Sequence, residues 1–224
     1  MARILCIETS TKVCSVGISI DGEITQLEED LSNRYSHAEN VNVFVQKVLG
    51  KMRFSEIDAV AVSQGPGSYT GLRIGVSTAK GICLGQNIPL LAINPLEAMA
   101  TGVSADENTL KIPMIDARRM EVFCSAYNSK GEQVIETQAE IITDTSFQNI
   151  EDFSKVLFFG DGAEKCRETL LPPRFQFIDR YASAKGMAGL SEKKFSNKDF
   201  ESLAYFEPFY LKDFVAGKPK KGLP

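Results

Sequence analysis

Histidine is almost absent from this chain of 224 residues, which contains only His37. Zinc sites of the His-Glu-x-x-His type need two imidazoles, and a Ser-His-Asp or Cys-His site would have to use this single one. His37 follows Ser36 at the expected start of a helix, so we expect a surface or helix-capping histidine, with contact to a partner as the alternative. The composition predicts no metal site.

Three other features are missing as well. The five cysteines include no Cys-x-x-Cys pair, no run approaches 18 apolar residues, and residues 1–3 do not resemble a signal peptide. These absences predict reduced thiols, a cytoplasmic protein and no contact with a membrane. The net charge of −4 argues against coating nucleic acid through overall charge, although it allows a local basic patch.

The first half of the chain is typical of a sheet with flanking helices. Asp21-Gly22 indicates a type I′ hairpin turn between two alternating runs. The polar stretch 102–111 lacks periodicity, which places a domain boundary near residue 104. The patterns predict strands at 4–7, 13–20, 23–28, 57–62 and 89–93, and helices at 41–52, 72–84 and 94–100.

The second half repeats this order. The strand at 112–116 ends in Asp116 as the first strand ends in Glu8, and each is followed by an alternating run and a glycine turn. Internal duplication and coincidence both remain open on this pattern. We expect a first lobe at 1–104 and a smaller lobe at 105–224, whose last segment is a candidate to pack back on the first. Further helices are expected at 163–171 and 181–192.

Two polar segments could bind an anion. A turn of Glu8, Thr9 and Ser10 after the first strand suits a hydrated cation and phosphate oxygens, or is an ordinary hairpin turn. A glycine-rich loop before a helix offers bare amides to an anion, or is a tight turn. Its candidate residues are Gly65, Gly67, Ser68, Tyr69 and Thr70.

Two cationic positions extend this prediction. Arg73 is expected in the first helical turn, where it would need a phosphate or a carboxylate as its partner. In the second half, Asp116 and Arg118 stand where the first copy has its acid turn. Bulky Ala117, Arg118 and Arg119 make this turn look degraded as a phosphate loop, although the arginines could still meet an anion.

The helices expected at 41–52 and 72–84 carry apolar faces that could be covered by another protein or by their own domain. The helix at 72–84 is apolar nearly all round and contains closely spaced small residues, which favours burial on every side. Together they could form an interface of about 1,600 Å². The candidate interface residues are Val41, Phe44, Val45, Val48 and Leu49 on the first helix, and Leu72, Gly75, Val76, Ala79 and Ile82 on the second.

Taken together, these segments resemble the TsaB (also called YeaZ) family, which serves threonylcarbamoyladenosine synthesis in tRNA. The family acid after the first strand is often Asp, where this chain has Glu8. The segments that carry the resemblance are 4–10, 65–75, 115–122 and 210–212.

The resemblance implies an ASKHA fold (actin-like, Hsp70 and sugar-kinase) of two related lobes. It implies a non-catalytic subunit that pairs with TsaD through the helices of the first lobe, joined by the ATPase TsaE, in forming N6-threonylcarbamoyladenosine next to the anticodon of tRNAs that read ANN codons. The resemblance also implies that the chain forms a homodimer when alone and that the assembled complex binds ATP or ADP with Mg. Whether the chain touches tRNA stays open, with Arg118, Arg119, Lys218, Lys220 and Lys221 as candidate cations.

Two other functions remain as alternatives. An independent ASKHA ATPase or small-molecule kinase would need a working acid at Glu8 or Asp116 and an intact second phosphate loop. A peptidase of the M22 type, a label that the family has also carried, would need paired histidines or a group activated by His37.

Overall fold

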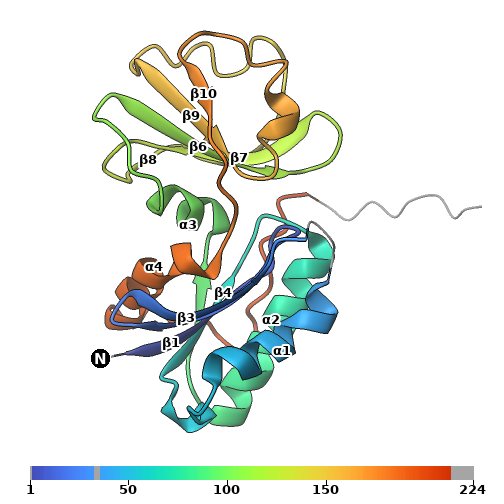
Figure 1. The fold of residues 1–224 in the computed structure, drawn as a ribbon, viewed down its shortest axis with the longest axis vertical. Coiled ribbons are helices and arrows are strands. Elements are labelled where there is room, and N and C mark those ends of the chain that lie inside the picture. The colour runs from blue at the N-terminus through green and yellow to red at the C-terminus, as the bar shows by residue number, and fades with distance from the viewer. Residues whose placement is uncertain (1, 33–35, 213–224) are drawn as a thin grey trace, which may run out of the picture.

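The computed structural model describes residues 2–32 and 36–212, and the predicted tail lysines lie outside them. Two five-stranded sheets form separate lobes, with two helices between them (Figure 1). No helix in the described residues is long and apolar enough to cross a membrane.

The sheet of the first lobe has the strand order β3-β2-β1-β4-β5. Its first three strands form an antiparallel meander, and β4 and β5 continue it in parallel with β1. The predicted turn is confirmed, because Asp21 and Gly22 both have positive φ angles, 51° and 79°. The strands are β1 (Arg3–Glu8), β2 (Cys14–Ile20), β3 (Glu23–Asp30), β4 (Ala59–Ser63) and β5 (Leu90–Ile93).

Helices cover both faces of this sheet because alternate side chains of β1 point to opposite sides. Leu5 and Ile7 pack in one core with α1 (His37–Leu49) and α2 (Tyr69–Gln86). Ile4 and Cys6 pack on the other face with α4 (Ala184–Ser196). Helix α2 begins three residues earlier than the predicted start at residue 72, because Ser68 caps it by accepting a hydrogen bond from the Gly71 amide at 3.3 Å.

The second lobe confirms the duplication. Its sheet order, β8-β7-β6-β9-β10, repeats the order of the first sheet, as an ASKHA-like α/β fold requires. The predicted helix at 163–171 is wrong: only a 3-10 turn forms, Glu164–Cys166, because this short turn already brings Ala163, Cys166 and Leu170 into the core of the lobe. The strands are β6 (Thr109–Asp116), β7 (Glu121–Tyr127), β8 (Gln133–Ile141), β9 (Lys155–Phe159) and β10 (Phe175–Phe177).

Two helices join the lobes. Helix α3 (Pro95–Thr101) precedes the link to β6, and α4 follows the second sheet and returns to the first (Figure 1). Their close approach depends on Gly186 of α4, because a Cβ there would collide with the Ala98 carbonyl oxygen of α3. The amide of Asn94, which caps α3, also donates to the Thr137 hydroxyl at 3.1 Å, so the first lobe is bonded directly to β8.

The last described segment, residues 199–212, we call the C-terminal strap. Its Glu201 amide donates to the Leu90 carbonyl at 2.9 Å, and the Phe209 amide donates to the Gln64 carbonyl at 2.7 Å. The Lys212 ammonium then binds Glu121 of β7. The strap therefore runs along the first lobe and ends on the second (Figure 1).

Candidate functional site

The glycine loop at 64–71 is filled by the chain's own backbone. A Cβ on Gly67 would collide with the Ser10 carbonyl oxygen, and one on Gly71 with the Thr9 carbonyl oxygen. The Ser68 amide, which could have faced an anion, donates to the Ser10 carbonyl at 2.6 Å. The structure brings the loop and the Glu8–Ser10 turn together, and the glycines make room for that turn.

Glu8 is buried completely at the end of β1. One of its oxygens accepts a hydrogen bond from the Ser10 amide at 2.6 Å, while Oε2 and the hydroxyls of Thr9 and Ser10 have no hydrogen-bond partner. Burial raises the pKa of the Glu8 carboxyl, and the hydrogen bond from the Ser10 amide opposes that rise. A phosphate could reach these groups only if the loop moved away, so their geometry does not fit a bound nucleotide.

The corresponding turn of the second lobe is exposed. Asp116 accepts a hydrogen bond from the Arg118 amide at 2.9 Å and pairs with Lys165. Gly162 packs against the backbone of Ile115 and Asp116, so a glycine lets the chain approach the end of β6 closely. No group of three or more His, Cys, Asp or Glu side chains within the described ranges is placed to hold a metal ion.

His37 is buried, and the expectation of a surface, capping or partner-contacting histidine is wrong. Its Nε2 atom lies 2.8 Å from the Thr11 carbonyl oxygen, and burial lowers the pKa of the imidazole. A Cβ on Gly71 would also contact the ring, so the glycine spacing of α2 makes room for it. His37 therefore ties the start of α1 to the β1–β2 turn.

Arg73 lies in the second turn of α2, not in the first, so it opposes the helix dipole less than expected. Its guanidinium contacts Tyr69, one turn earlier, at 3.3 Å from the hydroxyl and 5.4 Å from the ring centre. The ring of Tyr69 in turn packs on Tyr210 of the strap, with 4.9 Å between centroids. Tyr210 was not identified as a site residue from the sequence, and it entered only within the segment 210–212 that carries the family resemblance. No periodic pattern predicts that an irregular strap lies beside a helix.

The prediction for the partner interface needs correction. Nine of its ten residues, all except the partly buried Ile82, lie in the core of the first lobe, where a partner cannot touch them. The apolar stripe of α1 faces β2, and Gly75 and Ala79 of α2 are buried, so most of the apolar pattern is satisfied within the chain. Only the outward sides of α1 and α2 remain available for contact.

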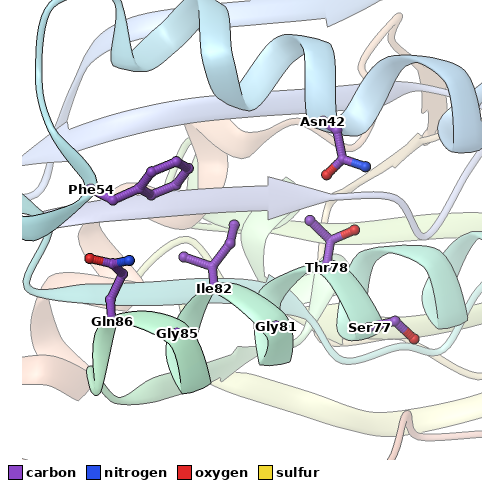
Figure 2. Close-up of a pocket in the computed structure, with 8 residues that line it drawn as sticks. All are labelled: Asn42, Phe54, Ser77, Thr78, Gly81, Ile82, Gly85 and Gln86. Carbon is purple, nitrogen blue, oxygen red and sulfur yellow. The ribbon is translucent and has the colours of Figure 1, made fainter.

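Those outward sides form a shallow groove. One hollow of about 540 Å³ lies between the helices, where Asn42 of α1 faces Thr78 and Ile82 of α2, with Phe54 closing one end (Figure 2). A second hollow of about 470 Å³ continues it past Thr78 to the helix starts. Other residues that line the two hollows are Ala38, Tyr69, Thr70, Arg73, Ile74, Ser77, Gly81, Gly85 and Gln86.

Comparison with known proteins decides the family. The model of the family TsaD, tRNA N6-adenosine threonylcarbamoyltransferase, matches residues 32–216. The TsaB protein of Escherichia coli K12 is 30% identical over 245 residues, covering 98% of this chain and 99% of that protein. The TsaB protein of Bacillus subtilis 168 is 32% identical over 163 residues, covering 70% of each chain. This chain belongs to the TsaB family.

A solved structure extends the likeness to the fold. YeaZ from Pseudomonas aeruginosa superposes with a TM-score of 0.80 at 22% identity, covering 94% of this chain and all of that one. Within this TsaB family member, the four segments that carried the resemblance converge at the boundary between the lobes. The Glu8 turn meets the glycine loop, Phe209 of the strap binds that loop, and Lys212 binds β7.

Proposed function

We propose that this chain is a non-catalytic scaffold subunit in the formation of N6-threonylcarbamoyladenosine in tRNA. It pairs with a TsaD-like transferase through the outward face of α1 and α2, and a TsaE-like ATPase joins the assembly in the cytoplasm. Without that partner, two copies pair through the same face. Family membership supports the pathway, and the geometry of the groove supports the face.

The main support for this pairing face is that Gly81 and Gly85 are exposed and that no described residue of the chain fills the space beside them. Both lie on the outward side of α2, and a Cβ added to either would meet nothing within 4 Å. Leu84, between them in sequence, is 77% exposed. Glycine weakens a helix by about 1 kcal/mol relative to alanine, so two exposed glycines without a packing role inside the chain favour a second helix that approaches closely.

The buried Glu8 carboxyl and the filled loop support the absence of catalysis. A phosphate needs bare amides, and here the Ser68 amide is bonded to Ser10. We expect the isolated chain to hydrolyse no ATP and to transfer no threonylcarbamoyl group, and expect modification of tRNA to appear when TsaD-like and TsaE-like partners are added. Turnover by the chain alone at an ordinary enzymatic rate would contradict this role.

The pairing face is tested with Gly81→Arg and Gly85→Arg, because these positions are open and the lobe should stay folded. The matched control is Gly189→Arg on α4, an exposed helical glycine whose Cβ would also meet nothing within 4 Å. We expect the α2 variants to lose binding to the TsaD-like protein in calorimetric titration, and the control to keep it. Unchanged binding by all three would reject this face.

Charged variants at Val45 or Ala79 would not test pairing. Both side chains lie in the lobe core, so an uncompensated charge there would cost several kcal/mol of folding stability.

A further inference from the structure

Exposed arginine and aromatic side chains stand on either side of the Lys212–Glu121 ion pair, where the strap crosses from one lobe to the other. We call this group the boundary patch and define it as Tyr69, Arg73, Arg118, Arg119 and Tyr210. Tyr210 stands two residues before Lys212, whose ammonium binds Glu121. Glu121 closes the turn that holds both arginines, because its amide donates to the Arg118 carbonyl at 3.2 Å.

The turn at 118–119 has an unusual sequence for its backbone. Arg118 and Arg119 have φ angles of 70° and 49°, a left-handed region that favours glycine and asparagine and costs other residues roughly 1–2 kcal/mol each. Turn geometry therefore does not explain two consecutive arginines. Both are exposed, and no carboxylate of the described residues pairs with either guanidinium.

Two of the three acids beside the patch are paired with lysines, and the third, Glu207, is exposed on the strap near Tyr210. Asp116 pairs with Lys165, and Glu121 pairs with Lys212. Arg73 likewise has no carboxylate within ion-pair distance among the described residues, since its contacts are with the Tyr69 ring and hydroxyl. Although the chain carries a net charge of −4, this patch presents three guanidinium groups without carboxylate partners.

The aromatic side of the patch is already ordered. Arg73 lies over the Tyr69 ring, and Tyr69 packs on Tyr210 at a centroid distance of 4.9 Å. Tyr210 remains 38% exposed beyond that contact. Exposed tyrosine rings stack on unpaired bases, and arginines bind phosphates or lie over base planes, which together is the chemistry of single-stranded RNA recognition.

We propose that the boundary patch binds an unpaired segment of RNA, with a base stacked on Tyr210 and phosphates held by Arg118, Arg119 and Arg73. This inference rests on the proposed function and identifies that RNA as part of the tRNA brought to the transferase. Tyr69 and Arg73 also line the groove at the starts of α1 and α2, so the patch adjoins the proposed pairing face.

The arginines are tested with the double variant Arg118→Asn, Arg119→Gly in the complex with the TsaD-like partner. Asn-Gly suits the turn, so the variant should unfold at a higher denaturant concentration than the parent. Its affinity for an unmodified tRNA transcript, measured by fluorescence anisotropy, should fall about tenfold, and the slope of log K against log salt should shrink by ~0.7 for each lost phosphate contact.

The control is Lys198→Gly, which removes an exposed cation at a φ of 56° just after the C-terminal end of α4. It should leave the affinity for tRNA unchanged. Tyr210 is tested separately: Tyr210→Phe keeps the stacking ring and should bind as the parent does, whereas Tyr210→Leu should lose about fivefold or more.

The outcomes separate this inference from the proposed function, because pairing with the TsaD-like protein is titrated for every variant. Normal pairing with unchanged tRNA affinity in the double and Tyr210→Leu variants overturns the RNA site and leaves the scaffold role standing. Weakened pairing with unchanged tRNA affinity means that the patch binds protein, and also overturns it. If the parent does not pair at all with the TsaD-like protein, the scaffold role fails. The same anisotropy measurements on the chain alone then decide whether the boundary patch binds RNA.

Discussion

The hydroxyl oxygen of Thr9 occupies the place where a methyl group on Gly75 would stand. One turn earlier on α2, Gly71 faces the Thr9 carbonyl oxygen in the same way, and Gly67 faces Ser10. Three glycines four residues apart thus let a helix start rest directly on the turn between β1 and β2. This contact positions the outward face of α2, where we propose that the partner binds.

Gly75→Ala should therefore destabilise the first lobe, because the new methyl group overpacks the contact with Thr9 by about 1–3 kcal/mol, more than alanine's gain in helix propensity of up to about 1 kcal/mol. Gly81→Ala is the matched control on the same helix. Its Cβ meets nothing, so it should stabilise the protein by about 0.5–1 kcal/mol. Urea denaturation of both measures the difference, and equal shifts would contradict the packing described.

Glu8→Gln should change how stability depends on pH. Because burial raises the pKa of Glu8, the folded chain holds this proton more tightly than the unfolded chain. Its stabilising contribution is present below the ordinary glutamate pKa and is lost as pH rises toward the raised value. Glutamine has no such proton, so the stability of the variant relative to the parent should increase as the pH rises above the ordinary pKa of glutamate. Stability is measured against pH for the parent, Glu8→Gln and the control Glu23→Gln, which changes an exposed side chain and should give the same curve as the parent. Parallel curves for all three proteins would contradict the burial of the Glu8 carboxyl.

Lys111→Met should loosen the link between the lobes. The buried Lys111 ammonium donates to the carbonyl oxygens of Ala100 at 3.3 Å and Val103 at 3.4 Å, at the end of α3. Methionine fills similar space but leaves both oxygens without this donor, at a cost of about 1–3 kcal/mol. Thermal unfolding should show the loss of stability, and amide hydrogen exchange should speed up in α3 and residues 102–108. The control Lys130→Met, at an exposed turn, should change neither the unfolding temperature nor the exchange rates.

Ser183→Ala should detach the start of α4. The Ser183 hydroxyl accepts from the Lys185 amide at 3.1 Å and donates to Glu29 at 2.6 Å, where Ser15 also donates. Loss of this cap should cost about 1–2 kcal/mol in chemical denaturation. Ser196→Ala, at the exposed end of α4, is the control. Because α4 covers the sheet face opposite α1 and α2, affinity for the TsaD-like partner should stay unchanged.

The local pattern of the chain predicted most of the first lobe. Alternation and turn chemistry placed β1, β2 and β3, and the apolar stripe from Val41 to Leu49 placed α1, because these signals depend on neighbours along the chain. The helix expected at 163–171 was wrong because the local pattern does not determine how a segment packs, and a single 3-10 turn already places Ala163, Cys166 and Leu170 in the core of the second lobe.

The candidate site was harder to predict. The glycine loop and the Glu8 turn were both recognised as candidate anion sites, yet a phosphate cradle and a backbone contact need the same small residues, and spacing does not distinguish them. Likewise, apolar side chains at helical intervals indicate burial without saying what buries them. Only the packed lobe assigns Val45 and Ala79 to the interior and leaves Gly81 and Gly85 outside.

By itself, the sequence determined that a similar order of strand and turn signals recurs in the second half and that the first half carries two apolar helices, whereas the sheet order established the duplication. Hydrogen bonding and side-chain alternation act over a few residues, and the chain encodes them directly. The tertiary structure alone decided which side of α2 is free and that the strap brings Tyr210 to Tyr69 beside the turn of Arg118. Those relationships join residues far apart in the chain, and they exist only once the two lobes have packed.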